Sequence, residues 1–176
     1  MESRHKKGFT LLETLVALSV LTFAVVGPLT LAFYSIRSAS LSQNQLTAFY
    51  LAQEAIEYVK NKRDTNVLAG ESNWLNGLAP SGGGKGLCRN IKGCTVDIPY
   101  NDIQICPPDG CLKMRYSSET GFYHQDTSRG VESPFTREIR LDIVSDYEEK
   151  VSVIISWTER FGVRSFTLEE NIFNWP

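Results

Sequence analysis

The sequence predicts an α+β protein: a long N-terminal α-helix, apolar in its first half, packs with its second half on a C-terminal antiparallel β-sheet. Three observations lead to this prediction. From Thr14 to Ile36 the 176-residue chain has 23 uncharged residues in a row. An amphipathic helical pattern follows without a turn signal, and the last part of the chain alternates apolar and polar residues as β-strands do. With 42% apolar residues, 22% charged residues and a net charge of -2, the composition is typical of a globular protein and gives no overall basic field for nucleic acid.

The uncharged run is long enough to span a bilayer. As a helix, its 23 residues extend about 35 Å, and a hydrocarbon core is about 30 Å thick. Arg4, Lys6 and Lys7 precede it and Arg37 alone follows, so the positive-inside rule predicts a cytoplasmic N-terminus and an outside head. A secretory signal peptide usually has an apolar region of about 7 to 15 residues and an Ala-x-Ala-like cleavage site, which fits poorly here. We therefore expect a single-pass protein of the cytoplasmic membrane, spanning it with residues 9–36.

One carboxylate, that of Glu13, lies near the start of this span. A charged side chain costs up to about 2.5 to 3.5 kcal/mol at the bilayer centre and less near its face, so a function for Glu13 is expected. The string Lys-Gly-Phe-Thr-Leu-Leu-Glu ends at Glu13, follows a short basic leader and precedes an apolar helix. Over about residues 4–25 it resembles the signal shared by type IV pilins, minor pilins and type II secretion pseudopilins.

This resemblance implies that a prepilin peptidase cuts between Gly8 and Phe9, so that residues 1–8 are a leader, and that the new amine of Phe9 is commonly methylated. Glu13 becomes the fifth mature residue, where the family carries its acidic side chain. Its carboxylate would neutralise the Phe9 amine of a neighbouring helix packed with an axial offset. The expected protein is a non-catalytic minor pilin or minor pseudopilin that leaves membrane lipid and, with other pilin subunits, enters or primes a filament at the cell surface.

Two other functions stay open. The chain could be a membrane-tethered binding protein or adhesin that displays its head to a host surface, or a DNA-uptake pseudopilin with nucleic acid as its partner. Aromatic residues are available for binding in either case: Tyr116, Phe122, Tyr123 and Trp157.

Gly27 and Pro28 interrupt the predicted span, because proline lacks an amide donor and clashes with the preceding turn. They predict a kink or a locally extended stretch. Residues 37–66 continue as an amphipathic helix that can pack on a sheet. Its apolar side is formed by Leu41, Gln45, Ala48, Ala52, Ala55 and Val59, with Leu51 and Ile56 beside them. The basic cluster from Lys60 to Arg63 is expected to favour the C-terminal end of this helix through the helix dipole.

Residues 67–134 are predicted to form a glycine-rich connection and a region with cysteines. The string Gly82-Gly83-Gly84-Lys85-Gly86 lacks the first glycine and the Ser or Thr of a phosphate loop. Outside the cytoplasm, the four cysteines Cys88, Cys94, Cys106 and Cys111 predict two disulfides, with three connectivities open. Their spacings are not those of a structural zinc site, so we expect no metal and no other cofactor.

Strand register favours one connectivity. A hairpin turn at Pro107-Pro108-Asp109-Gly110 would place Cys106 opposite Cys111, with apolar residues opposite apolar ones and charges opposite unlike charges. A fold at Tyr100 would set isoleucines against aspartates instead. We therefore expect the Cys106–Cys111 pair, which leaves the other two cysteines to pair with each other.

Residues 135–176 are predicted to form an antiparallel β-meander, with a turn at Phe161-Gly162. His5 lies in the leader, so His124 is the one imidazole of the mature chain, and no Ser or Cys has the sequence context of a nucleophile. Four carboxylates are expected on exposed strand faces or turns: Asp142, Asp146, Glu148 and Glu149. The sequence therefore predicts no enzyme.

Overall fold

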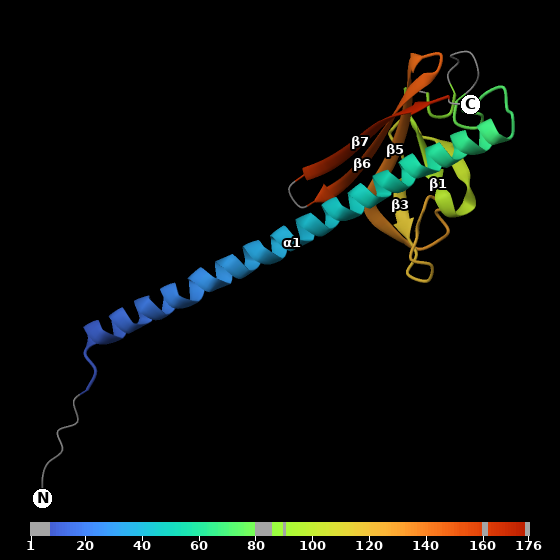
Figure 1. Ribbon diagram of the computed structural model, residues 1–176. Helices are drawn as coiled ribbons and strands as arrows, with labels where there is room; N and C mark the ends of the chain where they lie inside the picture. Colours follow the sequence, from blue (N-terminus) through green and yellow to red (C-terminus); the bar gives the residue numbers. More distant parts are fainter. Residues whose placement is uncertain (1–7, 80–85, 90, 160–161, 175–176) are drawn as a thin grey trace, which may run out of the picture. The chain divides into compact units, whose positions relative to one another are not determined.

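The computed structural model describes residues 8–79, 86–89, 91–159 and 162–174 (Figure 1). The predicted leader residues 1–7, most of the glycine-rich string at 82–86 and the first residue of the Phe161-Gly162 turn lie outside these ranges. The chain forms two compact units, Met1–Asn44 and Gln45–Pro176. We call the second unit the head and describe each unit by itself.

One helix, α1, runs from Leu11 to Leu68 and contains 58 residues. It passes through Gly27 and Pro28 without a break in its helical assignment, so the locally extended stretch expected there is wrong. A proline inside a helix removes only one backbone donor, and a helix of this length tolerates that loss. The kink stays a prediction.

The head contains an antiparallel sheet of seven strands in the described residues, so the α+β prediction is confirmed. The strands are β1 (Cys94–Asp97), β2 (Asp102–Ile105), β3 (Lys113–Tyr116), β4 (Tyr123–His124), β5 (Val131–Ser145), β6 (Glu148–Glu159) and β7 (Gly162–Phe173). Their order is β2-β1-β5-β3-β4, and β6 joins β5 to β7. Because β6 takes one edge of the long strand β5, β1 and β3 share its other edge.

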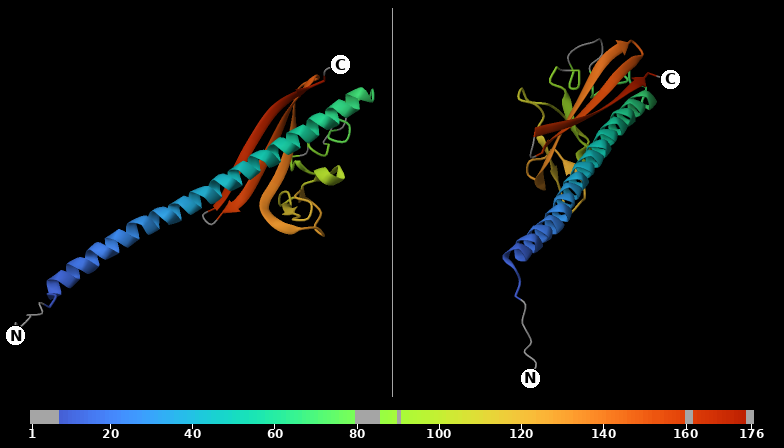
Figure 2. Two further views of the ribbon diagram at one scale, coloured as in Figure 1. Left: turned by 60° about the horizontal axis from the view of Figure 1, so that its bottom comes forward. Right: turned by 90° about the vertical axis from the view of Figure 1, so that its left-hand side faces the viewer.

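The core lies between the second half of α1 and one face of the sheet (Figure 2). The helix residues that face the sheet are mostly small, which lets the helix approach it closely. They are Ala48, Leu51, Ala52, Ala55, Ile56 and Val59, all buried as the apolar stripe predicts. Gln45, expected on the same stripe, is exposed. Opposite them lie the inward residues of β5 and β6, namely Ile139, Leu141, Val151, Val153 and Ile155. Burial of one Leu or Ile side chain contributes about 1.5 to 3 kcal/mol, so this contact holds the second half of α1 to the sheet.

The hairpin predicted at 107–110 is wrong. The chain reverses instead at a 3-10 turn, Ile98–Tyr100, and pairs β1 with β2. Asn101 has φ 52°, in the left-handed region that asparagine tolerates, and so completes the reversal. The register places Val96 opposite Ile103 and Asp97 opposite Asp102, so the pairing of isoleucines with aspartates that counted against a fold at this point does not occur.

The physical reason is that the carboxylate of Asp97 has partners outside the hairpin. Its Oδ2 accepts the backbone N–H groups of Gln125 at 2.9 Å and of Asp126 at 3.2 Å. Backbone donors stabilise a buried carboxylate. Asp97 therefore has hydrogen-bond donors of its own, and its position opposite Asp102 is tolerated.

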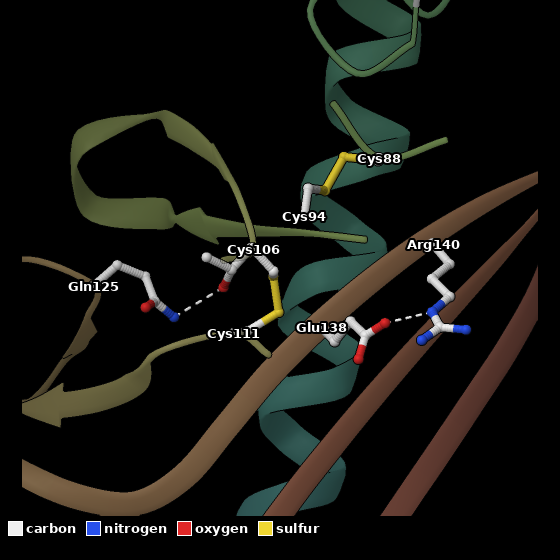
Figure 3. Close-up of a disulfide and its surroundings, with 8 residues drawn as sticks. Cys88, Cys94, Cys106, Cys111, Gln125, Glu138 and Arg140 are labelled. Carbon is white, nitrogen blue, oxygen red and sulfur yellow. Dashed lines mark hydrogen bonds and ion pairs between the residues drawn. A yellow bond between two sulfur atoms is a disulfide. The ribbon is translucent and has the colours of Figure 1, made fainter. Parts of the chain in front are cut away.

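The head contains two disulfides, Cys88–Cys94 and Cys106–Cys111, with Cα–Cα distances of 4.6 Å and 4.4 Å (Figure 3). The second disulfide closes the connection from β2 to β3 and does not lie across a hairpin. Cys106 and Cys111 are therefore close because a short loop joins them, and not because they lie opposite each other in a hairpin.

We expect peptide mapping of the unreduced protein to recover these two pairs. Trypsin cuts at Arg89 and Lys92, between the cysteines of the first pair, and a protease that cuts before aspartate separates the second pair at Asp109. Each pair should then appear as two peptides that separate on reduction. A peptide joining Cys94 to Cys106, or four free thiols with bound zinc, would contradict the assignment.

Candidate functional site

The predicted cleavage position lies in an exposed segment directly before α1. Gly8 and Phe9 are not helical, and Phe9 has 81% of its surface exposed. A Cβ atom built on Gly8 would have no neighbour within 4 Å. The described residues therefore leave the bond between them open to a peptidase.

Glu13 occupies the third position of α1, and Thr10 is the residue that caps the helix. The N–H of Glu13 donates to Oγ1 of Thr10 at 3.3 Å. Thr-x-x-Glu is the capping-box pattern, and a carboxylate at this position also lies at the positive end of the helix dipole. The pattern is present in the sequence, although the expected role of Glu13 was in filament contacts alone. The structure thus shows that the Thr10 hydroxyl caps the start of α1 through the Glu13 N–H.

The first unit exposes an unbroken apolar surface. From Leu11 to Ile36 every large apolar side chain has more than half of its surface exposed. Four hydroxyls in this segment do not need water, because each donates to the carbonyl three residues earlier, at 2.7 to 2.9 Å; they belong to Thr14, Ser19, Thr22 and Thr30. The helix is long and apolar enough to cross a membrane, and this fits membrane anchoring of the chain.

A buried arginine ties α1 to the sheet within the head. Arg137 of β5 is fully buried, and its Nη1 donates to Oε2 of Glu54 at 2.8 Å and to the Leu51 carbonyl at 3.4 Å. Its Nη2 donates to the Val96 carbonyl of β1 at 2.6 Å. Burial lowers the pKa of the Arg137 guanidinium, and the Glu54 carboxylate opposes that shift. Sequence reasoning missed this residue, although it lies on the same side of the strand alternation as the buried Phe135.

The basic cluster of α1 binds the last strand. Lys60 Nζ lies 2.7 Å from Oε1 of Glu170, and Arg63 Nη1 donates to the Phe173 carbonyl at 2.6 Å. The hydrogen bond to Glu170 raises the pKa of Lys60. These side chains thus connect the helix to β7. Because α1 continues to Leu68, the role expected for them, which was to favour the C-terminal end of the helix through its dipole, is not their main one.

The carboxylate of Glu149 is buried, contrary to the expectation that it lies on an exposed face. Only 1% of its surface is exposed, and Arg89 binds both of its oxygens, with Nε donating to Oε2 at 3.3 Å. Burial lowers the pKa of Arg89. Glu149 has the same parity in β6 as the buried Val151 and Val153, so the strand alternation continues to this residue and directs its side chain inward.

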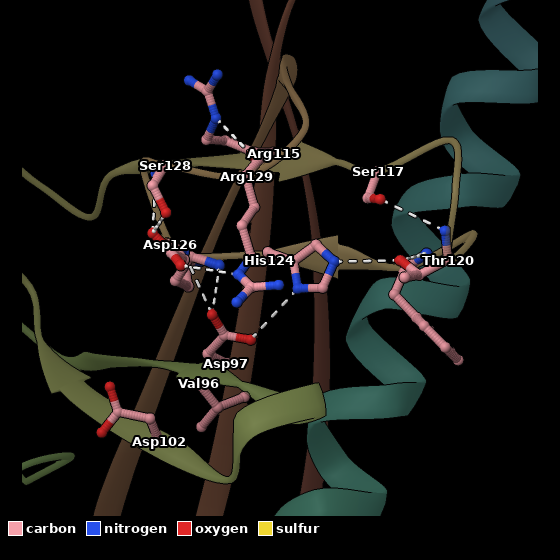
Figure 4. Close-up of polar contacts among 12 residues, drawn as sticks. Val96, Asp97, Asp102, Arg115, Ser117, Thr120, His124, Asp126, Ser128 and Arg129 are labelled. Atoms are coloured by element: carbon pink, nitrogen blue, oxygen red, sulfur yellow. Dashed lines mark hydrogen bonds and ion pairs between the residues drawn. The ribbon is translucent and has the colours of Figure 1, made fainter.

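His124 lies in a buried polar cluster behind the β3–β4 turn (Figure 4). Its Nε2 is 3.3 Å from Oγ1 of Thr120, and its Nδ1 is 3.8 Å from Oδ1 of Asp97. The order of these three residues is that of a hydrolase triad, but 3.8 Å is too long for a hydrogen bond. Oγ1 of Thr120 also accepts the N–H of Phe122 at 3.4 Å. These contacts therefore stabilise the β3–β4 turn.

The described residues contain no group of three or more His, Cys, Asp or Glu side chains arranged to hold a metal ion.

Comparison with known families gives one match. Residues 3–27 match the family described as the prokaryotic N-terminal methylation motif. This segment contains Gly8, Phe9 and Glu13, and the proteins that carry the motif are structural and not catalytic. The comparisons with curated proteins and with solved structures gave no match.

Proposed function

We propose that this chain, which its methylation motif assigns to the type IV pilin-like proteins, is a minor pilin or minor pseudopilin without enzymatic activity. One observation carries the proposal: an exposed Gly8–Phe9 bond lies one turn before Glu13, at the start of a helix whose large apolar residues between positions 11 and 36 are exposed in the monomer. In this function the helix inserts the subunit into a filament, or primes one, and the head is displayed outside.

The subunit begins as a membrane protein. Residues 1–8 are a cytoplasmic leader, residues 9–36 cross the bilayer, and the head lies on the outer side. Prepilin peptidase removes the leader and methylates the amine of Phe9. The exposed apolar surface of residues 11–36 supports lipid as the first environment of the helix and neighbouring subunits as the next.

Assembly then has an electrostatic basis. Cleavage leaves a positive amine on Phe9, in a region of low dielectric constant, close to the carboxylate of Glu13. When two helices pack with an axial offset, Glu13 of one subunit neutralises Phe9 of the next, and the desolvation cost of both charges is offset. Each subunit offers one charge of each sign, so the pairing repeats along a filament.

The head is suited to following the helix as one body. Arg137 binds α1 to β5 and β1, and Lys60 and Arg63 bind it to β7. These contacts lie on both sides of the apolar stripe. A pull on the second half of α1 would therefore reach the sheet through several bonds at once.

N-terminal sequencing of the membrane-bound protein is expected to begin at Phe9, which leaves 168 of the 176 residues. Gly8→Leu should remain at full length, because a large side chain then occupies the position where the peptidase cuts. Gly27→Leu is the matched control, since Gly27 also has no neighbour within 4 Å of a built Cβ, and it should be processed normally. An intact leader on wild-type protein in cells with active prepilin peptidase would reject the proposal.

A further inference from the structure

The head has a polar pocket that the filament function does not use. Its volume is about 310 Å³, at the lower end of small-molecule sites. Residues 117–120 and residues 128–131 line it, together with Tyr100, Tyr116 and the buried His124; Figure 4 shows several of these side chains. Its lining is rich in hydroxyls, including those of Tyr116, Ser117, Thr120 and Ser128.

The loop that forms one wall is held rigidly. Oδ1 of Asp126 accepts the N–H and the hydroxyl of Ser128 at 2.8 and 2.7 Å, and its Oδ2 lies 3.2 Å from Nε of Arg129. Arg115 donates to the carbonyls of Arg129 and Gly130 at 2.8 and 2.7 Å. A wall fixed in this way loses little conformational freedom when a ligand binds.

A glycine allows the close approach of this loop to β3. Gly130 has a φ of +65°, and a Cβ built on it would lie 2.4 Å from the Tyr116 carbonyl. No other residue fits without moving the backbone. The pocket shape thus depends on a specific residue in a loop that lies outside the apolar core.

The hydroxyls that line the pocket keep free hydrogen-bonding capacity. Oγ of Ser117 accepts one N–H, from Thr120 at 3.4 Å, and Oγ1 of Thr120 accepts one from Phe122 and bonds Nε2 of His124 at 3.3 Å. A hydroxyl has one donor and two acceptor lone pairs, so both can still take part in further bonds. Tyr116, a residue that is 41% exposed, adds an aromatic side chain.

Charge around the pocket selects against ions. The lining contains one cation, Arg129, and one carboxylate, Glu119. An adjoining pocket of about 450 Å³ shares Tyr100 and Arg129 and adds the carboxylates of Asp102 and Asp126. These carboxylates repel an anionic ligand, and Arg129, whose Cζ lies 4.9 Å from the Tyr100 ring centre, already occupies the ring face on which a ligand cation would stack.

We propose that this pocket binds a neutral sugar residue, such as a terminal hexose of a glycan. A sugar presents hydroxyls that both donate and accept, which the Ser, Thr and Tyr hydroxyls match, and an apolar C–H face that suits the ring of Tyr116. This binding goes beyond the filament function and does not depend on it.

The test uses the full-length mature protein in lipid nanodiscs. The protein is applied to an array of neutral glycans that end in glucose, galactose, mannose or N-acetylhexosamine. The same array carries sialylated and sulfated glycans. The pocket variant Tyr116→Phe/Thr120→Val removes one phenolic and one aliphatic hydroxyl. Tyr147→Phe/Thr167→Val removes the same two groups from exposed positions outside the pocket and is the matched control.

We expect the wild-type protein to bind a subset of neutral glycans, the pocket variant to bind them about tenfold more weakly and the control variant to bind them unchanged. Two lost neutral hydrogen bonds account for a change of that size. Thermal unfolding of the three proteins checks that the heads are intact. Failure to bind any neutral glycan, binding of anionic glycans only, or equal loss in both variants would overturn the proposal.

Discussion

Arg137→Ala is expected to destabilise the head by about 3 to 5 kcal/mol, the usual cost of removing one partner from a buried ion pair. The guanidinium is fully buried and bonds to Glu54, to the Leu51 carbonyl and to the Val96 carbonyl. Its removal leaves two buried carbonyls with one partner fewer and opens a cavity between α1 and the sheet. Unfolding of the mature protein in denaturant, followed by the fluorescence of the buried Trp157, measures the change.

The control for this prediction lies on the same strand. Arg140 also pairs with a carboxylate, Glu138, but its side chain is 46% exposed, so Arg140→Ala should change the unfolding free energy by less than about 1 kcal/mol. Glu54→Gln should cost less than Arg137→Ala, because the Glu54 side chain is 35% exposed and water can replace its partner. If Arg137→Ala unfolds within 1 kcal/mol of the wild type, the guanidinium does not hold the helix to the sheet.

The contrast between Arg137 and Glu13 shows what the sequence could predict. The N-terminal site was readable because its residues are contiguous and each has a local physical role. Arg137 has the strand parity of a buried residue, but its partner Glu54 lies 83 positions earlier, and no local pattern connects the two. Long periodic segments gave the helix, its buried stripe and the last three strands for the same local reason.

The hairpin shows how local pairing misleads. Matching apolar residues and unlike charges across a turn at 107–110 gave a consistent register, yet β1 pairs with β2 around Ile98–Tyr100. The deciding contacts are the backbone N–H groups of Gln125 and Asp126, which bind Asp97 from 28 and 29 positions away. The pocket beside His124 was unreadable for the same reason, because separate turns and strands assemble it.

Glu13→Ala is expected to abolish entry of the subunit into filaments while leaving its processing and membrane insertion intact. In a membrane-tethered monomer the carboxylate only burdens insertion, so its removal would leave abundance unchanged or slightly improved. In a filament it is the partner of a neighbour's Phe9 amine. Removing it leaves that amine buried without a partner, at a cost of about 3 to 5 kcal/mol, which corresponds to a hundredfold or greater loss of incorporation.

The capping-box position of Glu13 calls for a second variant, because Glu13→Ala removes the capping-box side chain and the charge together, although the backbone N–H that donates to Thr10 stays. Gln serves in a capping box as Glu does, so Glu13→Gln keeps the start of α1 and removes the charge alone. Thr10→Val does the reverse: it removes the hydroxyl that accepts the Glu13 N–H at 3.3 Å and keeps the carboxylate, at the usual capping cost of about 0.5 to 2 kcal/mol.

The three variants separate the two roles when sheared filaments are purified and the subunit is quantified against its membrane pool. Charge neutralisation predicts that Glu13→Ala and Glu13→Gln are both absent from filaments, although both are cut after Gly8, and that Thr10→Val is still incorporated. A helix-capping role alone predicts that Glu13→Gln enters like the wild type and that Thr10→Val fails. That second pattern, or wild-type incorporation of Glu13→Ala, would show that pairing between Glu13 and the Phe9 amine does not drive assembly of this subunit.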